Sequence, residues 1–133
     1  MRVSIERLTK RFGKVVAVQD LSLEIMDGEF VALLGPSGCG KTTILLTVAG
    51  IYRPTHGWIR FDGKVVNDLP PRERNIGMVF QSYALYPHMT VYENIAFPLT
   101  LRRMPRAEIH RRVVAAAQLL QIEELLDLKQ LGR

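Results

Sequence analysis

The chain carries at residues 35–43 the run Gly35-Pro36-Ser37-Gly38-Cys39-Gly40-Lys41-Thr42-Thr43. This run has the form G-x-x-x-x-G-K-[ST] and follows the apolar residues 30–34, so the sequence predicts a buried strand that turns into a helix. Glycines let such a turn curl until several backbone N–H groups point at one spot, and the following helix adds the positive end of its dipole there. An ordinary glycine-rich turn is the alternative, but this context favours a phosphate-binding loop for a polyphosphate.

Length and composition are those of one ordinary globular domain. The chain has 133 residues, of which 47% are hydrophobic and 23% are charged. No apolar run approaches the ~20 residues that a membrane-spanning helix requires, and residues 1–6 lack the pattern of a signal peptide. The single cysteine, Cys39, cannot form an internal disulfide, which agrees with a reducing compartment. We therefore expect a cytoplasmic location.

The formal net charge of +5 raises the question of nucleic-acid binding. The positive residues are scattered, and one loose cluster contains Arg102, Arg103, Arg106, Arg111 and Arg112. The sequence shows neither an aromatic platform for RNA nor a recognition helix for DNA. We interpret the cluster as a solvated helix face and expect no nucleic-acid partner.

The first part of the chain reads as β-structure punctuated by turns. Alternating or continuous apolar patterns predict strands at residues 3–8, 15–18, 21–25, 30–34, 58–61, 64–66 and 76–80. Phe12-Gly13, Asp27-Gly28 and Asp62-Gly63 mark turns between them. Residues 68–75 are polar and broken by prolines, so we expect them at the surface.

Three helices are expected. The first runs from Thr42 to about Gly50 and is apolar almost all round, which predicts that it is buried. The second opens at residues 90–93, which have the capping-box form, and Pro98 should kink or end it. The third has Pro105 in its first turn and Glu108 and Arg112 as an i,i+4 ion pair. Its apolar stripe consists of Ile109, Val113, Ala116, Ala117 and Leu120.

Residues 82–89 have no clean periodicity and contain a proline, which predicts a loop. Two tyrosines, a leucine and a methionine make this loop more apolar than a solvated loop should be. It either packs on its own domain or meets a partner.

Several motifs now stand in a recognisable order. Residues 11–13 (Arg-Phe-Gly), the loop at 35–43, residues 79–81 (Val-Phe-Gln) and the run SYALYPHMTVYENIAFPL at 82–99 resemble those of ATP-binding cassette (ABC) ATPases. The stretch 76–99 looks most like the carbohydrate-importer branch, the maltose/trehalose and glycerol-phosphate type. The resemblance implies an α/β fold: a P-loop NTPase core with an antiparallel β subdomain in residues 1–81, then the Q-loop continuation and the first part of a helical subdomain in residues 82–133.

The resemblance also implies site residues. Lys41 would reach the β- and γ-phosphates of ATP, and the Thr42 hydroxyl would coordinate Mg²⁺. Gln81 matches the glutamine whose side chain reaches Mg²⁺ and the attacking water, and Phe12 matches the aromatic that stacks on adenine. Without the resemblance, Phe12 would be interpreted as a core residue, and nothing would indicate a function for Gln81. The expected nucleotide-binding residues are Phe12, Gly35, Pro36, Ser37, Gly38, Cys39, Gly40, Lys41, Thr42 and Thr43.

Membrane partners follow from the same resemblance. Residues 82–95 match the surface that receives a coupling helix from transmembrane permease subunits, so we expect a peripheral location on the cytoplasmic face of the membrane. The expected contact residues are Tyr83, Ala84, Leu85, Tyr86 and Met89, with packing of the loop on its own domain as the alternative. A second ATPase subunit is the other expected partner, as a homodimer of the complete protein.

Several family motifs are not found in the sequence: the L-S-G-G-Q signature, a Walker B strand with its catalytic glutamate, and the switch histidine. We therefore expect these residues to be the N-terminal part of a longer protein, the energy-coupling ATPase subunit of a sugar importer. We expect this part alone to bind Mg-ATP without turning it over. We also expect residues 30–34 to be left exposed and the chain to self-associate. The alternatives are a truncated nucleotide-binding module and, less favoured, another P-loop NTPase, since no N-K-x-D guanine motif is present.

Overall fold

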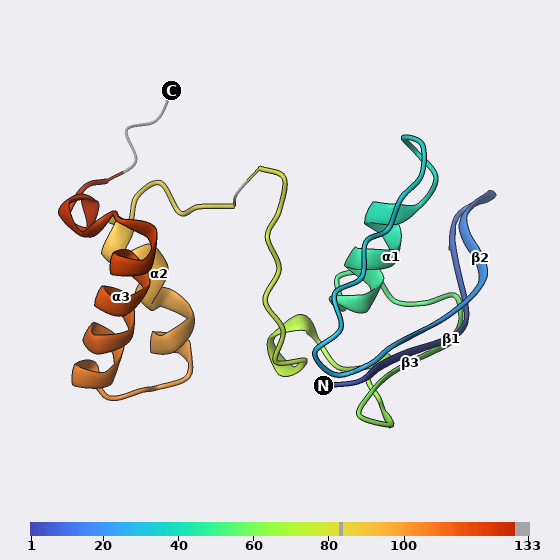
Figure 1. Cartoon of the computed structure of the whole chain (residues 1–133). Coiled ribbons are helices and arrows are strands. Elements are labelled where there is room, and N and C mark those ends of the chain that lie inside the picture. The colour runs from blue at the N-terminus through green and yellow to red at the C-terminus, as the bar shows by residue number, and fades with distance from the viewer. Residues whose placement is uncertain (83, 130–133) are drawn as a thin grey trace. The chain divides into compact units, whose positions relative to one another are not determined.

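The computed structural model describes residues 1–82 and 84–129, which divide into two compact units, Met1–Met78 and Val79–Arg133. Tyr83, one of the expected partner contacts, lies outside the described residues. Within the described ranges, no helix has both the length and the apolar content of a membrane-spanning segment. The domain boundary expected after residue 81 stays a prediction. Figure 1 labels the longer helices and strands of both units.

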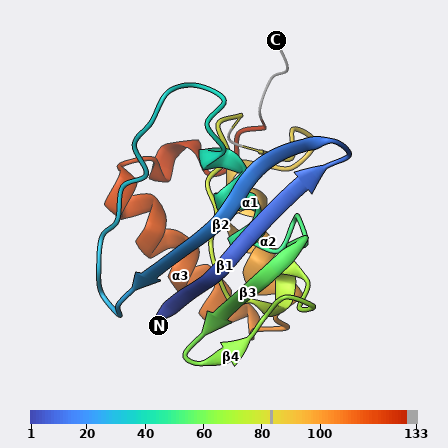
Figure 2. The same cartoon turned by 90° about the vertical axis from the view of Figure 1, so that its right-hand side faces the viewer.

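The first unit contains a four-stranded antiparallel sheet in the order β2-β1-β3-β4 (Figure 2). Its strands are β1 (Val3–Phe12), β2 (Val15–Ile25), β3 (His56–Phe61) and β4 (Lys64–Val65). The predicted turns at Gly13 and Gly63 both have positive φ angles, of 56° and 81°, as tight hairpins require. The prediction of two short strands at 15–18 and 21–25 is wrong: one strand covers both, with Asp20 at φ 49° where the pairing with β1 is irregular.

The core of the first unit lies between this sheet and the helix α1 (Lys41–Val48). Its buried apolar residues are Ile5, Leu8, Val18, Ile59, Phe61 and Val66. Ile44 and Val48 of α1 pack against them, but Leu45 is 52% exposed and Thr47 is the helix's buried residue. The expectation that α1 is buried all round is therefore wrong, because among the described residues only one side of the helix is covered.

Two apolar runs that were expected to be strands are not strands in the described structure. Residues 30–34 and 76–80 have no assigned secondary structure. Phe30 is 94% exposed, Leu34 91% and Val79 87%. A strand forms when its backbone N–H and C=O groups pair with a neighbouring strand, and no described strand lies beside either run. The strand predictions are wrong for this reason. The expected exposure of residues 30–34 is confirmed except at Leu33, which is half-buried.

The second unit is a hairpin of two helices, α2 (Val91–Leu101) and α3 (Arg106–Leu120), visible in Figure 1. The predicted capping box begins α2: the Thr90 hydroxyl accepts from the Glu93 N–H at 3.1 Å, and the Glu93 carboxylate accepts from the Thr90 N–H at 2.7 Å. Pro98 was expected to end or kink this helix, but α2 continues to Leu101. Pro98 is exposed, and packing of the opposite, apolar side of α2 against α3 holds the helix together.

The predicted stripe of α3 is confirmed in its central part. Ile109, Val113 and Ala117 are buried, while Leu120 is 64% exposed because α3 ends there and Gln121 turns to φ 56°. Two short 3-10 helices complete the described elements, η1 (Pro71–Glu73) in the first unit and η2 (Glu123–Leu125) in the second.

Candidate phosphate-binding site

The loop at residues 35–40 leads directly into α1. Gly38 and Gly40 have φ angles of 81° and 94°, and the Cys39 N–H donates to the Pro36 carbonyl at 3.4 Å. Gly40 is the N-cap residue of α1, and neither a capping side chain nor an acidic residue satisfies the first turn of the helix. Its N–H groups and its dipole therefore face an open loop, the arrangement that attracts an anion.

Lys41 folds back across this loop. Its Nζ donates to the carbonyls of Gly35 and Pro36, both at 2.6 Å, and lies 3.4 Å from the Cys39 Sγ. These contacts tie the beginning of the loop to the beginning of α1. They also hold the ammonium charge at the loop, where it adds to the positive end of the helix dipole.

The loop lies against the sheet with no room for a side chain at Gly40. A Cβ atom on Gly40 would lie 2.4 Å from the Ala17 carbonyl oxygen of β2. Because this neighbour is backbone and the φ angle is positive, both space and conformation call for glycine there. Residues of β2 thus support the loop directly.

Phe12 ends β1 on the same hairpin. It pairs with Val15 in β2, two residues before Ala17, so the hairpin that carries Phe12 also supports the loop at Gly40. The Phe12 side chain is 42% exposed. The sequence-based expectation that this ring and the loop belong to one site therefore agrees with the arrangement of the first unit, although its stacking on adenine stays a prediction.

Two neighbours of Phe12 are not predicted from the sequence. The Tyr52 ring lies edge-to-face with Phe12, with 5.1 Å between ring centroids and 77° between planes. The Lys10 Nζ lies 4.8 Å from the Phe12 centroid and 5.6 Å from that of Tyr52. Lys10 is two residues before Phe12 in β1, whereas Tyr52 follows α1 about 40 residues later. No pattern of neighbouring residues could therefore predict that the three side chains meet.

Arg74 closes the other end of α1. Its guanidinium donates to the carbonyls of Thr47 at 3.1 Å, Val48 at 2.8 Å, Leu69 at 2.8 Å and Asn67 at 3.3 Å. Arg74 is only 3% exposed, so the expectation that residues 68–75 all lie at the surface is wrong at this position. Burial lowers the pKa of the guanidinium below its ordinary value. The bonds nevertheless satisfy the last carbonyls of the helix and oppose the negative end of its dipole.

The other expected ligands of the loop line its surface or belong to the second unit. Ser37 and Thr42 are exposed, and Thr43 is half-buried in the first turn of α1. Gln81 is exposed in a turn of the second unit, so the structure does not join it to the loop within one unit. Among residues 1–82 and 84–129 there is no cluster of three or more His, Cys, Asp or Glu side chains that could hold a metal. The Thr42 hydroxyl still fits Mg²⁺, which is commonly held by one or two protein oxygens together with phosphate oxygens.

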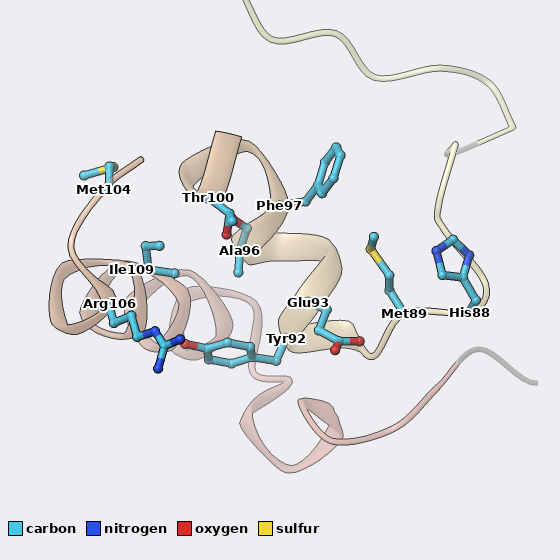
Figure 3. Close-up of a pocket in the computed structure, with 10 residues that line it drawn as sticks. All are labelled: His88, Met89, Tyr92, Glu93, Ala96, Phe97, Thr100, Met104, Arg106 and Ile109. Atoms are coloured by element: carbon cyan, nitrogen blue, oxygen red, sulfur yellow. The ribbon is translucent and has the colours of Figure 1, made fainter. Parts of the chain in front are cut away.

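The second unit contains a separate groove of about 710 Å³ (Figure 3). It is lined by His88, Met89, Tyr92, Glu93, Ala96, Phe97, Thr100, Met104, Arg106 and Ile109. Met89 is the one expected partner contact among these residues.

The loop before this groove is partly held by its own unit. Asn94 accepts from the Tyr86 N–H at 2.8 Å and donates to the Tyr86 carbonyl at 3.1 Å. The Tyr86 ring lies 4.9 Å from that of Phe97, yet Tyr86 remains 43% exposed and Leu85 53%. Ala84 is also exposed, at φ 48°. The loop therefore packs partly on α2 and still presents apolar side chains outward.

Comparison with known proteins agrees with this geometry. The family model described as ABC transporter matches residues 18–131. The chain is 58% identical over 126 residues to the trehalose/maltose import ATP-binding protein of Thermococcus litoralis, covering 90% of the chain and 34% of that protein. It is 56% identical over 127 residues to the osmoprotective compounds uptake ATP-binding protein of Synechocystis sp., covering 96% of the chain and 35% of that protein. The chain thus spans about a third of the length of these relatives.

Solved structures show the same likeness. A dimeric ATP-binding cassette in a post-hydrolysis state, bound to ADP and Pi, superposes with a TM-score of 0.84 at 32% identity. The match covers 98% of this chain and 63% of that one. The expected fold, that of an ABC ATPase cassette with an antiparallel sheet and helices, is confirmed.

Proposed function

This chain belongs to the ABC transporter family, and we propose that it forms the Mg-ATP-binding part of an ATPase subunit that drives an importer for sugars. The observation that carries the proposal is the open N-terminus of α1, with Lys41 held over the glycine loop. The relatives named as import ATP-binding proteins for trehalose/maltose and for osmoprotective compounds support the importer class.

ATP would bind through its phosphates at this loop. The backbone N–H groups from about Gly38 to Thr43 and the dipole of α1 attract the β- and γ-phosphates. Lys41 exchanges its two carbonyl acceptors, those of Gly35 and Pro36, for phosphate oxygens. The exchange is favourable because a charged acceptor makes a stronger hydrogen bond with an ammonium than a neutral one. The Thr42 hydroxyl would hold Mg²⁺, which would neutralise part of the phosphate charge.

The adenine base of ATP would lie toward the β1–β2 hairpin. Phe12 offers a half-exposed ring at the end of the hairpin that supports the loop. Adenine stacks on this ring, and the remaining loop residues, Pro36, Ser37 and Cys39, line the phosphates. Gln81 is the residue proposed to contact Mg²⁺ and the attacking water.

The groove of the second unit is the proposed receptor for a transmembrane permease subunit. Its apolar lining and its size suit the apolar face of a short helix, because amphipathic helices commonly bind in such grooves. Leu85 and Tyr86 present exposed apolar side chains beside Met89, so a partner would bury surface that the loop leaves open. Docking there would hold the protein at the cytoplasmic face of the membrane. A second ATPase subunit completes the assembly, in line with the dimeric cassettes among the solved structures.

A module that binds nucleotide without hydrolysing it is the second candidate. No carboxylate of the described residues belongs to the loop or to the first turn of α1, so neither of them supplies a general base for the attacking water. We accordingly expect this chain alone to bind Mg-ATP and not to turn it over. ATPase activity measured with and without the permease distinguishes the two candidates.

Binding is tested with two lysine variants. Lys41→Ala should weaken Mg-ATP binding at least about 100-fold, because it removes the charge-assisted contact to the phosphates. Lys64→Ala in β4 removes the same charge at an exposed position and should leave binding unchanged. The measurement is equilibrium titration with a fluorescent ATP analogue, competed by unlabelled ATP and GTP. Equal affinity of wild type and Lys41→Ala contradicts the proposal, and preference for GTP favours a different P-loop NTPase.

A further inference from the structure

The helical hairpin of the second unit carries opposite charges at its two ends. Residues 101–112, around the turn from α2 to α3, contain five arginines and one glutamate. The opposite end, where α2 begins and α3 has ended, carries the acidic residues Glu93, Glu123, Glu124 and Asp127. Figure 1 shows the turn at one end of the hairpin and residues 121–127 at the other. The positive charge of this unit is therefore concentrated at one tip.

Stability of the hairpin does not account for this concentration. Arg106 is the first residue of α3, where a positive charge opposes the helix dipole. Glu108 pairs with Arg111 at 2.7 Å and with Arg112 at 2.6 Å, so one carboxylate serves two arginines. Within residues 1–82 and 84–129, neither Arg103 nor Arg106 forms an ion pair. Arg103 and Arg106 therefore carry positive charge at the tip that no carboxylate of the described residues pairs with.

The composition of the tip suits a lipid surface. Leu101 is 68% exposed and stands next to the exposed Arg102 and Arg103. Arginines can bind lipid phosphates while a neighbouring leucine reaches the acyl boundary. Single-stranded nucleic acid would call for aromatic side chains on which bases stack, and residues 101–106 contain none.

We propose that the α2–α3 turn, residues 101–106, contacts the anionic headgroups of a lipid bilayer. Met104 and Arg106 also line the groove of this unit, so the turn and the groove adjoin. If the groove receives a membrane subunit, which rests on the proposed function, docking brings the turn to the bilayer. The lipid contact then adds affinity and fixes the orientation of the ATPase at the membrane.

The test compares two double variants with the same net charge. Arg102→Gln/Arg103→Gln removes two charges at the tip, and Arg53→Gln/Arg72→Gln removes two exposed charges from the first unit. Each protein, without nucleotide, is sedimented with vesicles of phosphatidylglycerol and phosphatidylcholine in equal parts, and with phosphatidylcholine alone. Wild type should bind only the anionic vesicles. The tip variant should bind them about 25-fold more weakly, about fivefold for each arginine, and the control less than about twofold more weakly.

The outcomes that overturn the proposal are distinct. An equal loss in both double variants means that only net charge acts, and no binding of wild type to anionic vesicles removes the lipid contact altogether. Binding of a mixed-sequence single-stranded RNA that depends on the tip, with vesicle binding unaffected, assigns the tip to nucleic acid instead. Arg102→Lys/Arg103→Lys keeps the charges and should bind like wild type, and a loss as large as that of the glutamine variant contradicts the proposal. Because nucleotide is absent, failure here leaves the ATP-binding test unaffected.

Discussion

The two ends of α1 are built in opposite ways. At its C-terminus, the buried Arg74 donates to two helix carbonyls and to two carbonyls of the following loop. At its N-terminus, Gly40 offers no side chain, no acidic residue lies in the first turn, and Lys41 adds positive charge. A helix built only for stability would be capped at both ends. The difference indicates that one end anchors the helix and the other is kept open for an anion.

The largest expected effect is at the anchored end. Arg74→Met should destabilise the first unit by about 3 kcal/mol, because several buried carbonyls lose their donor at once. Urea denaturation measures the change. Arg72→Met, at an exposed position in η1, is the control and should change stability by less than about 0.5 kcal/mol. If both variants unfold at the same urea concentration, Arg74 does not anchor α1.

The next effect is at the open end. Gly40→Ala should cost about 2 kcal/mol and displace the loop, since the new Cβ would meet the Ala17 carbonyl at 2.4 Å. Gly63→Ala is the matched control, because its φ angle is 81° but its Cβ would meet nothing within 4 Å. Both variants carry backbone strain, and only Gly40→Ala should also weaken Mg-ATP binding, by about tenfold or more. Unchanged ATP affinity in Gly40→Ala would show that the loop tolerates the displacement.

A smaller, kinetic effect is expected at the thiol in the loop. Cys39 is exposed and its Sγ lies 3.4 Å from the Lys41 Nζ, so bound phosphates would cover it. Saturating Mg-ATP should slow alkylation of Cys39 by N-ethylmaleimide about tenfold, and prior alkylation should block nucleotide binding. Mass spectrometry over time measures the rate. Equally fast alkylation with and without Mg-ATP would argue against contact between this loop and ATP.

The smallest expected effect concerns the first turn of α3, which contains an acidic residue where the first turn of α1 has none. The first turn of α3 contains Glu108, and hydrogen bonds from Arg111 and then Arg112 lower its pKa to about 2. A carboxylate whose pKa is lower in the folded state stabilises the fold above its ordinary pKa of 4.5, and this stability is lost as pH falls toward 2. Glu108→Gln should therefore flatten the decline in thermal unfolding temperature between pH 4.5 and 2. Glu124→Gln, which removes an exposed carboxylate outside the ion pairs described, should leave that decline unchanged.

Local signals predicted much of the fold. The hairpin turns at Gly13 and Gly63 and the capping box at Thr90 each depend on a few consecutive residues, and all three form as expected. The helix after the glycine loop was also placed correctly, because the G-x-x-x-x-G-K-[ST] run marks its beginning. Predictions about burial fared worse: α1 is covered on one side only, and Leu120 is exposed.

Some residues of the candidate site could be predicted from the sequence, and others could not. The loop residues and Phe12 could be named from their order in the chain, whereas Tyr52, Lys10 and Arg74 could not. A tyrosine after a helix or an arginine in a proline-broken polar segment has no distinguishing local pattern. Their contacts depend on where the end of α1, the end of β1 and the loop after β4 meet.

Glycines with positive φ, hairpin turns and a helix cap are specified by neighbouring residues, so the chain alone was sufficient to identify the phosphate loop and the resemblance to ABC ATPases. Pairing of strands and burial of a charge depend on residues far apart in the chain. For that reason only the folded structure revealed Arg74 at the end of α1 and the Tyr52 ring against Phe12. It also showed residues 30–34 without a described neighbouring strand, because an apolar run becomes a strand only where another backbone satisfies its hydrogen bonds.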